Sequence, residues 1–114
     1  METDAQPAAA PLLQWSSQAV FDVAAERRRQ IEVEGWTPEH DNEHGDDSMT
    51  LAAACYALAN VPALEVQTLK LRDLWLWTGW ASSWFKPKDR RANLVRAAAL
   101  LLAEIERLDR RSTT

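Results

Sequence analysis

The sequence predicts an all-α protein, a small bundle of three to four helices with an acidic loop between the first two, and it is expected to self-associate. Two long segments repeat apolar residues at helical spacing, and helix-capping residues stand at their starts. A chain of 114 residues, of which 46% are hydrophobic, suffices for one modest core. We therefore expect an N-terminal tail at 1–15, a single helical domain at 16–110 and a C-terminal tail at 111–114.

The first helix is expected at about residues 17–34. Ser16 and Ser17 are typical N-cap residues, and Gly35 is a typical stop in the left-handed conformation. Its apolar positions follow helical spacing and are Val20, Ala24 and Ile31. Its polar side carries a stripe at every fourth position, formed by Glu26, Gln30 and Glu34.

Three consecutive arginines lie within this helix. Because successive helical positions point about 100° apart, the three cannot face one partner. We expect Arg27 to face inward and Arg28 and Arg29 to be solvated. Arg27 and Gln30 are candidate ligand-binding residues, and the alternative is an ordinary charged helix face.

The acidic loop, GWTPEHDNEHGDD at residues 35–47, contains both histidines of the chain. Residues 37–39 read as an N-cap, a proline and an acid, which predicts one short helical turn. His40 and His44 would then project on the same side, near several carboxylates. Imidazole suits zinc and manganese, and carboxylate suits magnesium and manganese. The candidate ligands of a weakly bound divalent metal (Mg, Mn or Zn) are Glu34, His40, Asp41, His44 and Asp46.

The alternative for this loop is a plain helix entrance, because acidic residues suit the positive end of a helix dipole. The HxxxH spacing lacks the catalytic glutamate of HExxH, and no cysteine lies nearby. A structural zinc site is therefore not expected.

A second helix is expected from Asp47 or Ser48 to about Asn60, ahead of Pro62. Its many alanines permit close approach of a neighbour, so it should lie in the centre of the bundle. The next stretch mixes alternating and helical patterns. It predicts a helix or an irregular segment at about 63–77 and then a turn at residues 78–79.

The last helix is expected at about residues 89–110. Asp89 is an N-cap residue after Pro87. Apolar residues then recur at steps of three and four, at Leu94, Ala98, Leu101, Ile105 and Leu108.

An aromatic cluster precedes this helix and consists of Trp75, Trp77, Trp80, Trp84 and Phe85. Tryptophan is enriched where a surface meets a ligand or another chain, but some of these residues are needed for the core. Four cations follow at the start of the helix, where free N–H groups and the helix dipole attract anions. The pattern predicts a phosphate-binding site, with candidates Trp36, Trp84, Lys86, Lys88, Arg90 and Arg91.

Several classes of protein are disfavoured by composition. A net charge of −4 and a pI near 5.1 argue against general binding to duplex DNA. The lone Cys55 cannot form an internal disulfide, and the N-terminus lacks the pattern of a secretory signal, which indicates a cytoplasmic protein. The apolar run LVRAAALLLAEI is interrupted by Arg96 and followed by acids, so no membrane span is expected.

Three blocks, ERRRQIEVEGWTPEHDNEH, AAACYAL and WFKPKDRRANLVRAAALLLAEIERLDR, resemble a family of small uncharacterised phage and prophage proteins over most of residues 24–110. Their order also resembles, more distantly, MazG-like all-α nucleotide pyrophosphohydrolases. That resemblance implies paired acids on successive helices that hold Mg²⁺ against a nucleoside triphosphate, while water attacks between the α- and β-phosphates.

This chain departs from the MazG-like pattern at two places. The second helix contains no glutamate, and Asn93 stands where an acid would be needed. The carboxylates that could form a rearranged site are Glu26, Glu34, Asp41 and Asp46.

The sequence therefore predicts a phage or prophage accessory protein, in the cytoplasm of a bacterial host, that binds a nucleotide or another phosphate-bearing ligand. A divalent metal could assist, and a degenerate pyrophosphohydrolase is one form of this function, although binding is favoured over hydrolysis. The competing interpretation is a protein-binding inhibitor of a host defence complex, similar in role to anti-CRISPR proteins, that acts through its acidic loop or its tryptophans. A nucleotide binder needs acids, cations and aromatics around one concave site, whereas an inhibitor can present them on a convex surface.

Overall fold

The computed structural model describes residues 17–35, 47–61 and 70–112. These residues form helices and connecting segments and contain no strand, which confirms the predicted all-α class. The helical elements are α2 (Gln18–Glu32), α4 (Ser48–Leu58), α5 (Leu71–Leu76), the short 3₁₀ helix η3 (Ser82–Trp84) and α6 (Arg90–Ser112).

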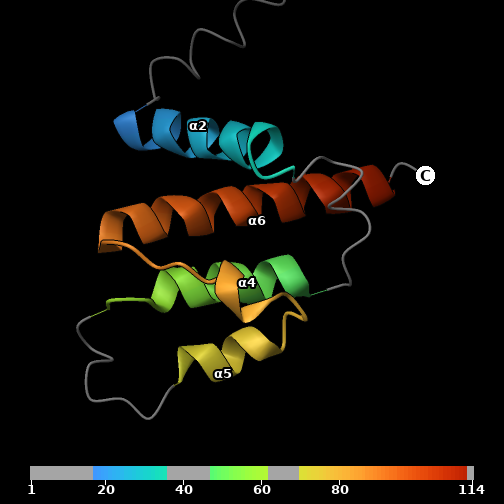
Figure 1. The fold of residues 1–114 in the computed structure, drawn as a ribbon. Helices are drawn as coiled ribbons and strands as arrows, with labels where there is room; N and C mark the ends of the chain where they lie inside the picture. Colours follow the sequence, from blue (N-terminus) through green and yellow to red (C-terminus); the bar gives the residue numbers. More distant parts are fainter. Residues whose placement is uncertain (1–16, 36–46, 62–69, 113–114) are drawn as a thin grey trace, which may run out of the picture.

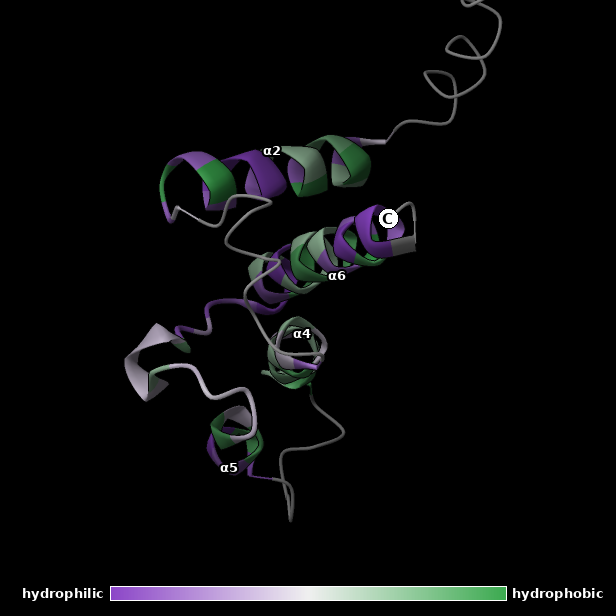
Figure 2. Ribbon diagram, turned by 90° about the vertical axis from the view of Figure 1, so that its right-hand side faces the viewer, coloured by the Kyte–Doolittle hydropathy of each residue, from purple (hydrophilic) through white to green (hydrophobic). Residues whose placement is uncertain are grey.

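The four α-helices lie in a row, in the order α2, α6, α4, α5 (Figure 1). Figure 2 shows the same order from the side. The main packing contacts join α4 to α6, α2 to α6 and α4 to α5. Both α6 and α4 are therefore interior members of the row, and α2 and α5 cover its two ends.

Helix α2 begins as the sequence predicts. Ser17 has an extended backbone, and its hydroxyl accepts a hydrogen bond from the Val20 N–H at 3.3 Å, which is the N-cap arrangement. The helix ends at Glu32, two residues earlier than expected, and Gly35 then adopts a positive φ of 77°. A left-handed residue therefore follows the helix, as the glycine predicts.

The core lies between α4, α6 and the aromatic residues around α5. Its alanines come from both of the interior helices, which fits their close packing. The buried apolar residues of the cluster are Met49, Ala52, Ala53, Cys55, Tyr56, Ala59, Trp75, Trp80, Phe85, Ala97, Leu100 and Ala103.

Trp75 stands at the centre of the aromatic part of this core. Its ring stacks on Phe85, with 4.9 Å between centroids, and meets Tyr56 and Trp80 edge-on. Its indole N–H donates to the Ala81 carbonyl at 3.0 Å. Trp77, by contrast, is 77% exposed. The predicted aromatic cluster thus divides between the core and the surface.

Helix α6 has the predicted N-cap, because the Asp89 carboxylate accepts from the Ala92 N–H at 3.0 Å. It continues through Ser112, two residues into the segment predicted as a tail. Its buried apolar side is formed by Ala97, Leu100 and Ala103. The apolar residues that predict the helix, by contrast, lie largely at its surface: Leu94, Leu101, Ile105 and Leu108 are 42% to 55% exposed.

Three expectations concern residues that lie outside the described ranges: the tail at 1–15, the helical turn at 37–39 and the first part, residues 63–69, of the segment at 63–77. Within the described part of that segment, α5 is helical and residues 77–79 form the predicted turn. None of the helices in the described ranges is long and apolar enough to cross a membrane.

We predict a large difference between two substitutions at α5. Trp75→Ala removes a side chain that is 2% exposed and should lower the free energy of unfolding by about 3–5 kcal/mol. Trp77→Ala removes an exposed ring and should change it by about 0.5 kcal/mol or less. Urea unfolding followed by circular dichroism measures both values, and equal losses would contradict the placement of the two rings.

Candidate functional site

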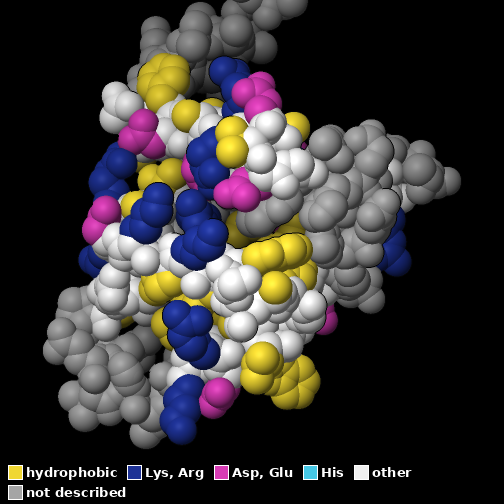
Figure 3. Space-filling model, viewed as in Figure 1, with side chains coloured by type: hydrophobic (Ala, Val, Ile, Leu, Met, Phe, Trp, Pro, Cys, Tyr) yellow, Lys and Arg dark blue, Asp and Glu magenta, His cyan; other side chains and the backbone are white. Residues whose placement is uncertain are grey.

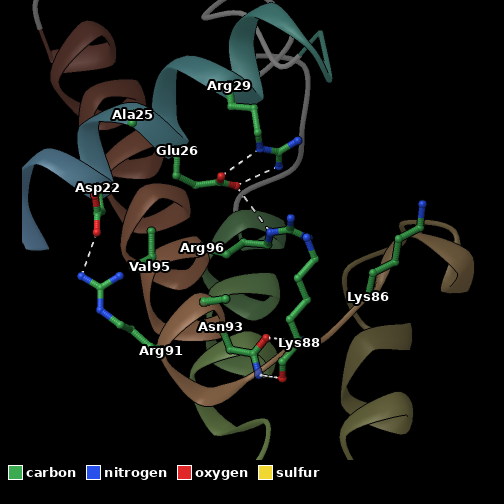
Figure 4. Close-up of a pocket in the computed structure, with 11 residues that line it drawn as sticks. Asp22, Ala25, Glu26, Arg29, Lys86, Lys88, Arg91, Asn93, Val95 and Arg96 are labelled. Atoms are coloured by element: carbon green, nitrogen blue, oxygen red, sulfur yellow. Dashed lines mark hydrogen bonds and ion pairs between the residues drawn. The ribbon is translucent and has the colours of Figure 1, made fainter.

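A polar pocket of about 400 Å³ opens between α2, the N-terminal part of α6 and the basic segment, which we define as residues 86–88 (Figure 4). Figure 3 shows Lys and Arg side chains gathered on this face of the molecule. The residues that line the pocket are Asp22, Ala25, Glu26, Arg29, Lys86, Lys88, Arg91, Ala92, Asn93, Val95 and Arg96.

The first end of the basic segment is fixed by Tyr56 of α4. The Tyr56 hydroxyl donates to the Trp84 carbonyl at 3.0 Å and accepts the Lys86 N–H at 3.0 Å. It also accepts from Arg96 at 3.3 Å, and the Arg96 guanidinium lies 5.2 Å from the centre of the Tyr56 ring. The hydroxyl has one donor and two acceptor positions, and these contacts use all three.

The second end of the basic segment is fixed by two asparagines. Asn93, which is buried, accepts the Lys88 N–H at 2.6 Å and donates to the Lys88 carbonyl at 2.9 Å. Asn60 donates to the same carbonyl at 2.6 Å from a left-handed position, with φ at 61°. An ionised acid at position 93 would lack the N–H that reaches the carbonyl. Asn93 therefore serves here to hold the backbone of Lys88.

The carboxylate of Glu26 is bound by two arginines. Arg29 donates to both of its oxygens, at 2.8 and 2.9 Å, and Arg96 lies 3.4 Å away. Burial alone would raise the pKa of Glu26, but the hydrogen bonds and charge of Arg29, together with the charge of Arg96, hold it below its usual value. The hydrogen bonds that Arg29 donates to Glu26 and to Glu34, and the charges of these two acids, raise the pKa of Arg29.

Asp22 is held in a similar way at the other side of the pocket. It accepts from Gln18 at 2.8 Å and pairs with Arg91 at 2.8 Å. The hydrogen bond from Gln18 and then that from Arg91 lower the pKa of Asp22. Both carboxylates of the pocket are therefore ionised at neutral pH and already bound by guanidinium groups.

The lysines of the basic segment are arranged differently. Among the described residues, neither Lys86 nor Lys88 makes an ion pair. In Figure 4 the Lys88 side chain points toward the end of Arg96, whereas Lys86 points away from the other lining side chains. The pocket walls thus carry five cationic side chains and two acidic ones. An anion that enters would meet a net positive wall.

Three of the predicted ligand-binding residues, Lys86, Lys88 and Arg91, line this pocket. Arg90 is exposed and does not line it, because one step along a helix turns the side chain by about 100°. Trp84 packs beside Trp80, at 6.0 Å between centroids, and also lies outside the lining. The pocket brings cations together with two acids, Asp22 and Glu26, and no aromatic ring lines it.

The helix α2 candidates face inward without reaching the pocket wall. Arg27 is buried, as predicted, and its guanidinium binds Glu106 of α6 at 3.1 Å. Gln30 is completely buried and donates to Glu26 at 3.3 Å. Arg29 is not the solvated residue that we expected, because its side chain is only 34% exposed and binds Glu26. Neither Arg27 nor Gln30 is therefore placed to contact a ligand in this pocket.

One of the predicted metal ligands lies among the described residues. Glu34 is described, and it binds Arg29 at 2.9 Å. The remaining candidates His40, Asp41, His44 and Asp46, and the ligand candidate Trp36, lie outside the described residues. Within the described ranges, no group of three or more His, Cys, Asp or Glu side chains could hold a metal ion. The metal of the acidic loop stays a prediction.

Sequence reasoning missed Asp22, Arg29, Asn93 and Arg96 as lining residues. Asp22, Glu26 and Arg29 follow one another at steps of four and three on α2, so they share one face. This periodicity of polar residues was a usable signal. The sequence carries no such signal for the pairing of that face with Arg91 and Arg96, because this pairing depends on how two distant helices pack.

Comparisons of the chain with protein-family models, with curated proteins and with solved structures find no match.

We predict that Glu26 makes the stability of the fold depend on acid pH. Because its pKa is lowered on folding, its contribution is fully present above its ordinary pKa of 4.5 and is lost as the pH falls through the lower folded value. The free energy of unfolding should therefore fall less from pH 7 to about pH 3 for Glu26→Gln than for the unmodified protein. Glu32→Gln, an exposed position on the same helix, is the control. A Glu26→Gln profile parallel to that of the control would contradict this role.

Proposed function

We propose that the pocket between α2, α6 and the basic segment binds a phosphate-bearing ligand, such as a nucleotide, through its phosphate groups. The observation that carries the proposal is the concentration of five cationic side chains around one hollow of about 400 Å³, in a chain whose net charge is −4. A hollow of this size falls within the range of small-molecule sites, which is roughly 300–1,000 Å³.

The cations of the pocket differ in what they can offer an anion. Lys86 and Lys88 carry compact charges without ion pairs in the described residues, so binding a phosphate costs no existing bridge. Arg96 adds a planar guanidinium to the same pocket lining, a shape that suits phosphate oxygens. The first turn of α6 forms part of the wall, and the positive end of its dipole favours negative charge.

We favour binding over hydrolysis for this pocket. Its two carboxylates, Asp22 and Glu26, are each bound by an arginine, and a metal-assisted hydrolase needs carboxylates grouped around the metal. A cationic wall with neutralised acids is better suited to holding a phosphate group than to activating water against it. The phage origin, the bacterial cytoplasm and a metal in the acidic loop are further expectations from the sequence.

One observation favours the competing function, binding to another protein. Trp77 is 77% exposed and Leu76 is 66% exposed, side by side at the end of α5. Exposed tryptophans are frequent anchors of protein interfaces. This surface lies on a different helix from the pocket, so substitutions can separate the two functions.

We predict that the double variant Lys86→Ala/Lys88→Ala binds phosphates at least about tenfold more weakly, because each lost charge-assisted contact is worth about 1.5–3 kcal/mol. Isothermal titration calorimetry with ATP and with inorganic triphosphate, at one fixed salt concentration, measures the loss. Lys70→Ala is the matched control, because Lys70 is an exposed lysine outside the pocket lining.

Adenosine serves as a second probe in the same titrations. Binding through phosphates predicts that adenosine binds much more weakly than ATP. The proposal fails if the unmodified protein binds neither phosphate compound, or if the double variant and Lys70→Ala bind them equally well.

A further inference from the structure

One side of α6 carries an exposed apolar stripe, which we call the α6 stripe. It consists of Leu94, Ala98, Leu101, Ile105 and Leu108. The four larger side chains are 42% to 55% exposed, although they are the most hydrophobic residues of that surface. The steps between members alternate between four and three residues, which is the spacing of a helix that packs lengthwise against another helix.

An apolar groove of about 310 Å³ adjoins this stripe. It lies between α2 and α6 and is lined by Ala19, Val20, Val23, Ala24 and Leu102. On the surface of α6, Leu102 is the neighbour of both Ala98 and Ile105, because helical residues three and four apart stand next to each other. The stripe and the groove therefore form one continuous apolar face, extended on α2 by Val20, which is 52% exposed.

We propose that this face is the contact between two copies of the chain, with the two α6 helices packed antiparallel about a two-fold axis. In the register that places Ala98 opposite Leu101 of the second copy, Leu94 lies opposite Ile105. Each central layer then combines a small and a large side chain, the next layers combine Leu94 with Ile105, and Leu108 at each end lies opposite Arg91. A two-fold axis repeats every such contact, so one stripe is complementary to itself.

Charge at the ends of the helix favours the antiparallel direction. In the same register Arg90, an exposed residue at the start of α6, lies at the same level along the helix axes as the exposed Asp109 of the second copy, with the two residues on opposite edges of the seam. A parallel pair would instead bring Arg90 to the level of Arg90 and Asp109 to the level of Asp109, which places like charges at the same end of the pair.

The extent of the face also matters for a dimer. The stripe from Leu94 to Leu108 covers about 21 Å of helix at the standard rise per residue, which gives a short seam when taken alone. The groove beside it widens the contact onto α2, and stable interfaces bury roughly 800 Å² per partner. The alternative occupant is the apolar sequence LLQW at residues 12–15 of the same chain.

The mass of the full chain in solution tests the proposal. Light scattering at micromolar concentrations should give about twice the chain mass of 12.9 kDa. Leu101→Lys should shift the mass to that of one chain and leave the helical circular dichroism signal unchanged. Leu76→Lys is the matched control, because Leu76 is also exposed but lies on α5, and this variant should remain dimeric.

A single-chain mass for the unmodified protein would overturn the proposal and favour coverage of the face by residues 12–15. An unchanged dimer in Leu101→Lys would overturn it as well, because the dimer would then use another surface.

Disulfide trapping tests the direction of the helices. The Leu94→Cys and Ile105→Cys proteins are oxidised separately and as a mixture. The native Cys55 thiol should not interfere, because it is buried and burial raises its pKa to about 11. Antiparallel pairing brings position 94 close to position 105 but keeps two copies of position 94 about 16 Å apart along the helix axis, beyond disulfide reach. Cross-linked dimers that form only in the mixture support the proposal. Cross-links that form in either protein oxidised alone would overturn the antiparallel arrangement. The absence of cross-links from all three samples would overturn it as well.

Discussion

The hydrogen-bonding position of the Tyr56 hydroxyl connects the core of this protein to its candidate site. The Tyr56 ring lies in the core, edge-on to Trp75 and Phe85, so its position is set by aromatic packing. Its hydroxyl, at the edge of that core, binds the backbone of residues 84 and 86. Lys86 of the basic segment is therefore placed by core packing. A change that moves the Tyr56 ring would also move the pocket wall.

The helices of the fold could be predicted because their ends and spacing are local properties. The Ser17 and Asp89 caps and the left-handed Gly35 all act within a few residues of the chain. What could not be predicted is which side of α6 is buried. The strongest apolar periodicity lies on the exposed α6 stripe, whereas the side that packs in the core contains alanines, Leu100 and the buried Asn93. Close packing of α4 against α6 needs small residues, and these give a weak hydrophobic signal.

The candidate site was predictable to the extent that it depends on one segment of chain. Lys86, Lys88 and Arg91 follow from cations near a helix start, where an anion is favoured. The opposite wall comes from α2, more than 50 residues earlier in the sequence, and its contribution depends on the packing of α2 against α6. Arg27 shows the limit of reasoning from burial, because it faces inward as predicted yet binds Glu106, away from the pocket lining.

Helices α2 and α6 carry both the polar pocket and the apolar face, on different sides. On α6 the pocket is lined by positions between 91 and 96, and none of these belongs to the α6 stripe. Arg91 illustrates how close the two surfaces come, since it precedes Leu94 by less than one turn but is turned toward Asp22 by their ion pair. That ion pair keeps a cation on the pocket side at the end of an apolar row. Pairing of two stripes would thus use side chains that do not line the pocket, and Arg91, which lies opposite Leu108 in that register, would stay turned toward the pocket by its ion pair with Asp22.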